Sequence, residues 1–124
     1  MDITPLVPAD RQLIHGYGDL GFTISGVRWE GSVLVLPGAT VPWRAASVAD
    51  ADAAGLAPVI AAAPRPRILL LGCGPTIAPI SRELRTALRA EGIVVELMDT
   101  GAACRTYNVL LTEDRLVAAA LIAV

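Results

Sequence analysis

Short apolar runs alternate with longer, helix-like segments through the second half of this chain, and this order constrains the fold more than any other feature. The apolar runs at 67–71, 93–98 and 116–122 have the length of buried strands, and the segments 79–91 and 102–111 lie between them. Strand, helix, strand, helix, strand at this spacing is typical of right-handed crossovers onto one sheet, with helices on its faces. We therefore predict an α/β fold with a mixed, largely parallel central sheet.

The expected helix at 79–91 is amphipathic. Ile80, Leu84 and Leu88 recur every fourth residue, so they would share the face that packs on the sheet. The opposite stripe consists of Arg82, Arg85 and Arg89. We expect this basic stripe to be a solvated surface, with docking of an acidic partner as the alternative.

The first half of the chain favours β structure. The segments 12–15, 21–24 and 32–36 are strand candidates, and glycine-rich turns at 16–19 and 26–31 separate them into an N-terminal β-hairpin region. The run 33–36 is continuously apolar, which predicts a strand covered on both faces. The segment 47–63 is expected to be helical in part, because Gly55 and Pro58 interrupt it. Together these elements predict one domain over residues 1–124.

Composition excludes several classes of function. The formal net charge of −2 gives no reason to expect nucleic acid as a partner, and the absence of lysine excludes Schiff-base chemistry and a P-loop. The two cysteines match no zinc pattern, so we expect no metal, no cofactor and two reduced thiols. The first ten residues do not form a secretory signal, and the apolar runs are too short for a transmembrane segment. We therefore expect a cytoplasmic protein, and its richness in arginine and alanine suggests a bacterial one.

Two loops are candidates for a binding site. In an open α/β sheet, ligands bind beyond the carboxyl ends of the strands, where the loops 72–76 and 99–101 would share one rim. The first loop contains Gly-x-Gly, but Ile77 replaces the third glycine of a dinucleotide motif. We expect a tight turn there, with an anion on its backbone amides as the alternative.

The second loop opens a segment, 98–108, that concentrates polar groups. Asp99 or Thr100 is expected to cap the following helix. Arg105 would form an ion pair with Asp99 or Glu96, or alternatively bind a carboxylate or phosphate. Cys104 lies in the first turn, where the helix dipole favours a thiolate, but the only histidine, His15, is distant in sequence. We name no catalytic residue, and the candidate ligand-binding residues are Gly72, Cys73, Gly74, Thr76, Asp99, Thr100, Cys104, Arg105 and Asn108.

Six pieces of the sequence, in order along nearly the whole chain, resemble one family. The pieces are His-Gly-Tyr-Gly (15–18), 21–26, 31–37, 69–74, Val-Glu-Leu-Met-Asp-Thr (95–100) and Ala-Cys-Arg-Thr-Tyr-Asn-Val-Leu (103–110). The chain is similar to the Mth-domain family of unknown function, which includes mitochondrial complex I (NADH dehydrogenase) assembly factor three and the adipogenesis-associated Mth-domain-containing protein. Cys73 departs from the pattern, since a threonine or similar small residue is expected there.

The resemblance implies a three-layer α/β fold and no established enzymatic activity. The eukaryotic complex I factor acts with partner proteins at the inner mitochondrial membrane, so the expected function is a non-enzymatic accessory role in assembling a respiratory NADH dehydrogenase. Such a protein would be peripheral to the inner membrane through its partners. The alternatives are a protein that binds a small anionic metabolite at the rim of 72–76 and 99–108, and a thiol enzyme using Cys104. Trp43 and the apolar hairpin also make a homodimer an open expectation.

Overall fold

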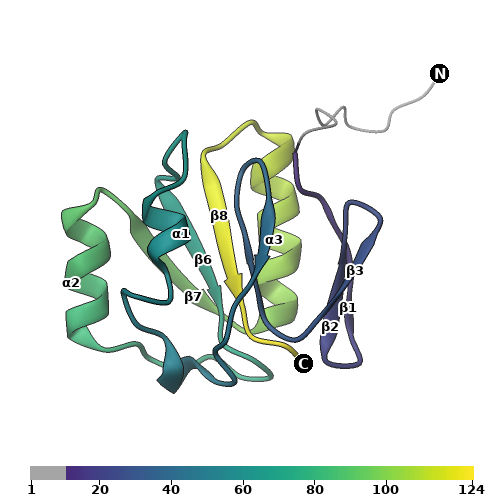
Figure 1. Cartoon of the computed structure of the whole chain (residues 1–124), viewed down its shortest axis with the longest axis horizontal. Coiled ribbons are helices and arrows are strands. Elements are labelled where there is room, and N and C mark those ends of the chain that lie inside the picture. Colours follow the sequence, from purple (N-terminus) through teal and green to yellow (C-terminus); the bar gives the residue numbers. More distant parts are fainter. Residues whose placement is uncertain (1–10) are drawn as a thin grey trace.

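A five-stranded mixed sheet runs through the middle of the structure, a computed structural model that describes residues 11–124 (Figure 1). Its strand order is β5–β4–β8–β6–β7, with β4 at Val33–Val35, β5 at Thr40–Pro42, β6 at Ile68–Gly72, β7 at Val94–Met98 and β8 at Val117–Leu121. The strands β8, β6 and β7 pair in parallel, whereas β4 is antiparallel to both β8 and β5. The predicted mixed sheet of an α/β fold is confirmed.

Helices cover both faces of this sheet (Figure 1). They are the 3-10 turn η1 (Val48–Asp50), α1 (Ala57–Ile60), α2 (Arg82–Ala90) and α3 (Thr100–Thr112). On one face, Val59 of α1 and Leu84 and Leu88 of α2 pack with sheet residues such as Leu69. On the other face, α3 packs against β6 and β8 through residues that include Tyr107. The buried strand β4 serves both cores, as predicted, because Leu34 faces one and Val33 and Val35 face the other.

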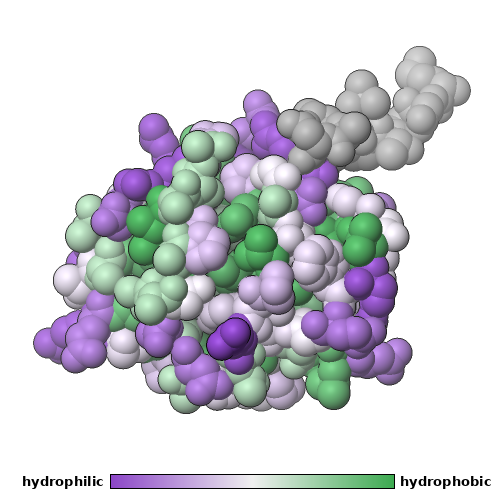
Figure 2. Space-filling view, viewed as in Figure 1, coloured by the Kyte–Doolittle hydropathy of each residue, from purple (hydrophilic) through white to green (hydrophobic). Residues whose placement is uncertain are grey.

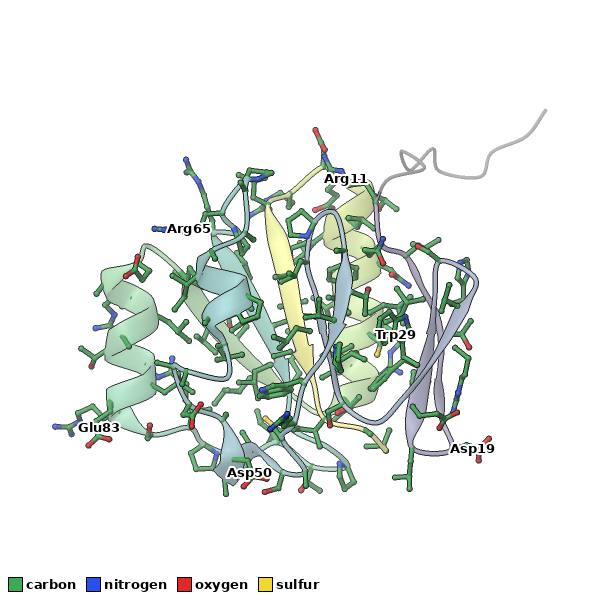
Figure 3. All side chains as sticks on the ribbon, in the orientation of Figure 1. Arg11, Asp19, Trp29, Asp50, Arg65 and Glu83 are labelled. Atoms are coloured by element: carbon green, nitrogen blue, oxygen red, sulfur yellow. The ribbon has the colours of Figure 1, made fainter. Side chains whose placement is uncertain are left out.

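A second, three-stranded antiparallel sheet lies beside α3 on the same face of the large sheet. It consists of β1 (Ile14–Gly18), β2 (Gly21–Ile24) and β3 (Val27–Glu30), in that order. Ile14, Phe22 and Ile24 point inward and share the core of α3. Figure 3 shows Trp29 on the inner side of this sheet and Asp19 at the tip of its first hairpin. The predicted N-terminal hairpin region is therefore confirmed, and it is larger than expected.

Two strands and one helix differ from the sequence-based prediction. The segment 26–31, predicted as a turn, contains β3, because Ser25 and Gly26 alone make the turn, both at positive φ. The strand β5 was missed because it has only three residues and ends at a proline. The expected helix within 47–63 is reduced to η1 and the four residues of α1, with Pro58 in the first turn of α1.

Trp43 lies in the core. Together with the apolar hairpin it left a homodimer as an open expectation, yet only 7% of it is exposed and it packs under α1. The expectation about a secretory signal falls on residues that lie outside the described part of the chain. Within residues 11–124, every helix is too short to cross a bilayer.

Candidate functional site

The two loops named as a candidate rim lie against each other at the carboxyl ends of β6 and β7. The Cys73 amide donates to the Met98 carbonyl at 2.8 Å, and the Thr100 amide donates to the Gly74 carbonyl at 2.9 Å. Gly72 makes this approach feasible, since a Cβ at that position would lie 3.0 Å from the Thr100 Cα. The crossover geometry inferred from the strand order thus places the loops together.

Thr100 joins the rim to the C-terminal strand. Its hydroxyl accepts from the Gly74 amide at 2.9 Å and donates to the Ile122 carbonyl at 2.7 Å, and the residue is fully buried. The cap of α3 is Asp99, whose Oδ1 accepts from the Ala102 amide at 2.8 Å, as the sequence predicted. Thr100 is instead the first residue of the helix and an internal hydrogen-bond bridge.

These bonds use the amide donors that an anion would need at the rim. The amides of Cys73, Gly74, Thr100 and Ala102 all donate to oxygen atoms of the chain itself. Gly72, Cys73 and Gly74 are buried, while Thr76 is exposed in the turn beyond them. Four amides at the rim are therefore engaged by the protein's own oxygen atoms, and anion binding at 72–76 stays a prediction.

Cys104 is placed in the core rather than at a reactive surface. Only 3% of it is exposed, and burial raises the pKa of its thiol to about 12, an effect that the adjacent Arg105 guanidinium only partly offsets. The expected influence of the helix dipole does not prevail, because desolvation of the thiolate costs more. Burial thus disfavours the thiolate that a thiol enzyme would need at Cys104, and the use of Cys104 by such an enzyme stays a prediction. Cys73 is also a buried free thiol.

Asn108 holds the small sheet against α3. Its Nδ2 donates to the Ile14 carbonyl at 2.7 Å, and its Oδ1 accepts from the Ile14 amide at 3.0 Å. Both ends of the side-chain amide are used in this way, at the free edge of β1 beside a register shift between Ile14 and Gly16. A residue named as a candidate ligand is thus a clamp between two elements.

Arg105 makes no ion pair with Asp99 or Glu96, contrary to the expectation. Its Nη1 donates instead to the Tyr17 hydroxyl at 3.1 Å, across 88 residues of sequence. The two side chains point in different directions, because Asp99 caps the helix through the Ala102 amide whereas Arg105 points toward Tyr17 of β1. The three ion pairs found among residues 11–124 involve Arg11, Arg28 and Arg65.

A slot of about 150 Å³ lies between β1 and α3. It is lined by Ile14, His15, Gly16, Tyr17, Cys104, Arg105 and Asn108. His15, Tyr17 and Arg105 are exposed. Tyr17 and the neighbouring edge of β1 were not among the residues predicted from the sequence, although the Gly-Tyr-Gly piece was a signal for them. Among residues 11–124, no three His, Cys, Asp or Glu side chains gather as a metal site would require.

Comparisons with known proteins extend over nearly the whole domain. Residues 14–122 match a protein family of unknown function, DUF498/DUF598. A Xenopus tropicalis protein named NADH dehydrogenase [ubiquinone] 1 alpha subcomplex assembly factor 3 is 34% identical over 114 residues, which is 92% of this chain and 62% of that protein. This chain thus spans less than two thirds of that relative.

Two solved bacterial structures have the same fold. One is described as an outer membrane protein from Bartonella henselae and is 33% identical, with a TM-score of 0.86 over 95% of this chain and 98% of that one. The other is described as a Mth938-like domain from Bordetella pertussis and is 31% identical, with a TM-score of 0.80 over 98% of this chain and 92% of that one.

Proposed function

This chain belongs to the DUF498/DUF598 family, and we propose that it is a non-enzymatic accessory protein that assists the assembly of a respiratory NADH dehydrogenase (complex I). The observation that carries the proposal is the 34% identity to a named assembly factor over 92% of this chain. In this proposal the domain acts by contact with subunits or other factors, peripheral to the inner membrane. The match covers only 62% of that relative, so the idea that this chain contacts the same kind of partner proteins is itself part of the proposal.

Several polar residues of the segment 98–108 form hydrogen bonds within the fold, which supports a role in binding other proteins rather than in catalysis. Within the segment 98–108, Asp99 caps α3, Thr100 bridges the rim to the C-terminus and Asn108 clamps β1. The same segment carries much of the sequence resemblance. The pieces that resemble the family therefore stabilise the architecture, as is expected of a domain that presents a shaped surface.

The first hairpin of the small sheet is the surface that best fits a partner. Leu20 is 66% exposed at its tip and adopts a φ of 59°, which is unfavourable for leucine and natural for glycine or asparagine. Its amide donates to the Val124 carbonyl, which fixes the tip to the C-terminus. This strained and exposed apolar side chain buries little surface within the described part of the chain, which supports a contact of the hairpin tip with a partner.

A gene deletion tests the assembly role. We expect the deletion strain, grown under respiratory conditions in the organism that encodes this chain, to contain less assembled NADH:quinone oxidoreductase on native gels. NADH:quinone activity of its membranes is expected to fall in parallel, and the wild-type gene on a plasmid is expected to restore both. Unchanged levels of the assembled complex in the deletion strain would contradict the proposal.

A further inference from the structure

The positively charged side chain of Arg105 lines the slot between β1 and α3 and is anchored there by a hydrogen bond. Arg105 is exposed, yet its guanidinium is anchored by the Tyr17 hydroxyl at 3.1 Å. Gly101, in the first turn of α3, makes this contact possible. A Cβ on Gly101 would lie 2.6 Å from the Tyr17 Oη and 3.3 Å from the Arg105 Nη1. Three residues from two distant segments are thus built around one guanidinium.

The charges that face the slot are unbalanced. The charged side chain that lines the slot is Arg105 from α3, and among the described residues no carboxylate lies within ion-pair distance of it. Asp99, at the start of the same helix, accepts from the Ala102 amide and does not line the slot, although its charge acts on Cys104. A guanidinium in a concave surface without a carboxylate favours an external oxyanion, which it can bind with charge-assisted hydrogen bonds.

The size of the slot limits the ligand. Its volume of about 150 Å³ is well below the roughly 300–1,000 Å³ of pockets that hold drug-sized molecules. A nucleotide does not fit, whereas a carboxylate or phosphate group on a molecule of a few heavy atoms does. The Tyr17 hydroxyl, already beside the guanidinium, can donate to the same anion.

We propose that this slot binds a small free oxyanion, a short-chain carboxylate or phosphate, with Arg105 as the charge partner and Tyr17 and His15 as its walls. The site lies on the β1 side of α3, and none of the residues 72–76 lines it. It is independent of the assembly proposal, because either can fail without affecting the other.

An NMR titration tests the site. Amide resonances of Gly16, Tyr17, Gly101 and Arg105 are followed at constant pH while sodium acetate or sodium phosphate is added, with sodium chloride at matched ionic strength as the reference. We expect saturable shifts confined to these residues with at least one of the two anions. The two arms decide whether a carboxylate or a phosphate is preferred.

Three variants link the shifts to the slot. Arg105→Gln should weaken binding about tenfold or more, because it removes a charge-assisted hydrogen bond. Arg85→Gln, a matched change on α2, should leave binding unaltered. Gly101→Ala should also weaken binding by moving Tyr17 from Arg105, while the helix stays as stable or becomes more stable. Shifts that follow chloride equally, or an Arg85→Gln effect equal to that of Arg105→Gln, would overturn the proposal.

Discussion

At the scale of single residues, Thr100 has the largest structural role in the segment 98–108. One buried hydroxyl satisfies both the Gly74 amide and the Ile122 carbonyl, at a point where β6, α3 and the C-terminus meet. Neither backbone group has access to water if the hydroxyl is removed. A buried backbone group left without a partner destabilises a protein by about 1–3 kcal/mol.

Replacing Thr100 with valine tests this role, because valine keeps the shape and removes the hydroxyl. We expect the Thr100→Val variant to lose roughly 2–4 kcal/mol of unfolding free energy. The matched control is Thr100→Ser, which keeps the hydroxyl and loses one methyl group, at a cost of about 1 kcal/mol. Urea unfolding followed by circular dichroism measures both variants. Equal stability of the two would show that the bridge contributes little.

Two buried acidic groups, Cys104 and Tyr107, predict a loss of stability at alkaline pH. Burial raises the pKa of Cys104 from 9.0 to about 12, and it also raises the pKa of Tyr107 above its usual range. Between pH 9 and 12 the unfolded chain releases the Cys104 proton while the folded chain retains it. Stability is therefore fully present below pH 9 and falls above it, by about 1.4 kcal/mol per pH unit for a single group.

Substitution separates the two groups. In Cys104→Ala, the decline of unfolding free energy between pH 9 and 12 should be shallower than in the wild type, and Tyr107→Phe should remove its own part. The Tyr107 hydroxyl is buried and finds no hydrogen-bond partner among residues 11–124, so Tyr107→Phe is also expected to be neutral or stabilising at pH 7. Denaturant titrations at several pH values provide the measurement. An alkaline slope that is identical in all three proteins would refute the assignment.

At the scale of elements, the regular second half was predictable and the irregular connections were not. Strands β6, β7 and β8 and helices α2 and α3 follow from apolar runs and from i, i+4 spacing. The strand β3 was not predicted because it begins immediately after a two-residue turn. The strand β5 is too short to show the alternation of apolar and polar residues that identifies a strand. The slot beside Arg105 was not predicted from the sequence for a related reason. The contact of Tyr17 with Arg105 joins residues 88 positions apart, and no local pattern encodes it.

The attachment of the small sheet to α3 gives a prediction at this scale. Asn108 makes both hydrogen bonds to Ile14, so Asn108→Ala should free the edge of β1 and cost about 1–3 kcal/mol. Hydrogen exchange should become faster for amides of β1 and β2, with a smaller change in β6 and β8. Thr106→Ala, on another flank of the same helix, serves as the control. If exchange increases equally in both sheets, Asn108 does not act as a local clamp.

At the scale of the whole molecule, the two sheets and α3 form one layered body whose ends differ in character. The hairpin tip with Asp19 and the rim after β6 lie at the edge where the chain ends, visible in Figures 1 and 3. On the face shown in Figure 2, hydrophilic residues are spread around much of the outline, and apolar ones lie over the middle and also at the right-hand edge. Leu20 is an apolar side chain at the hairpin end, so the assembly proposal can be tested there without disturbing the core.

The variant Leu20→Asn separates folding from partner contact. Asparagine tolerates the positive φ of this turn better than leucine, and little buried area is lost, so thermal stability should be unchanged or slightly higher. If the hairpin tip contacts a partner, the same variant should restore less assembled NADH dehydrogenase to the deletion strain than the wild-type gene does. Val94→Asn provides the control, because Val94 is 59% exposed at the start of β7, at the opposite end of the strands. Full restoration of the complex by Leu20→Asn would exclude the hairpin tip as the contact, even if the deletion itself impairs assembly.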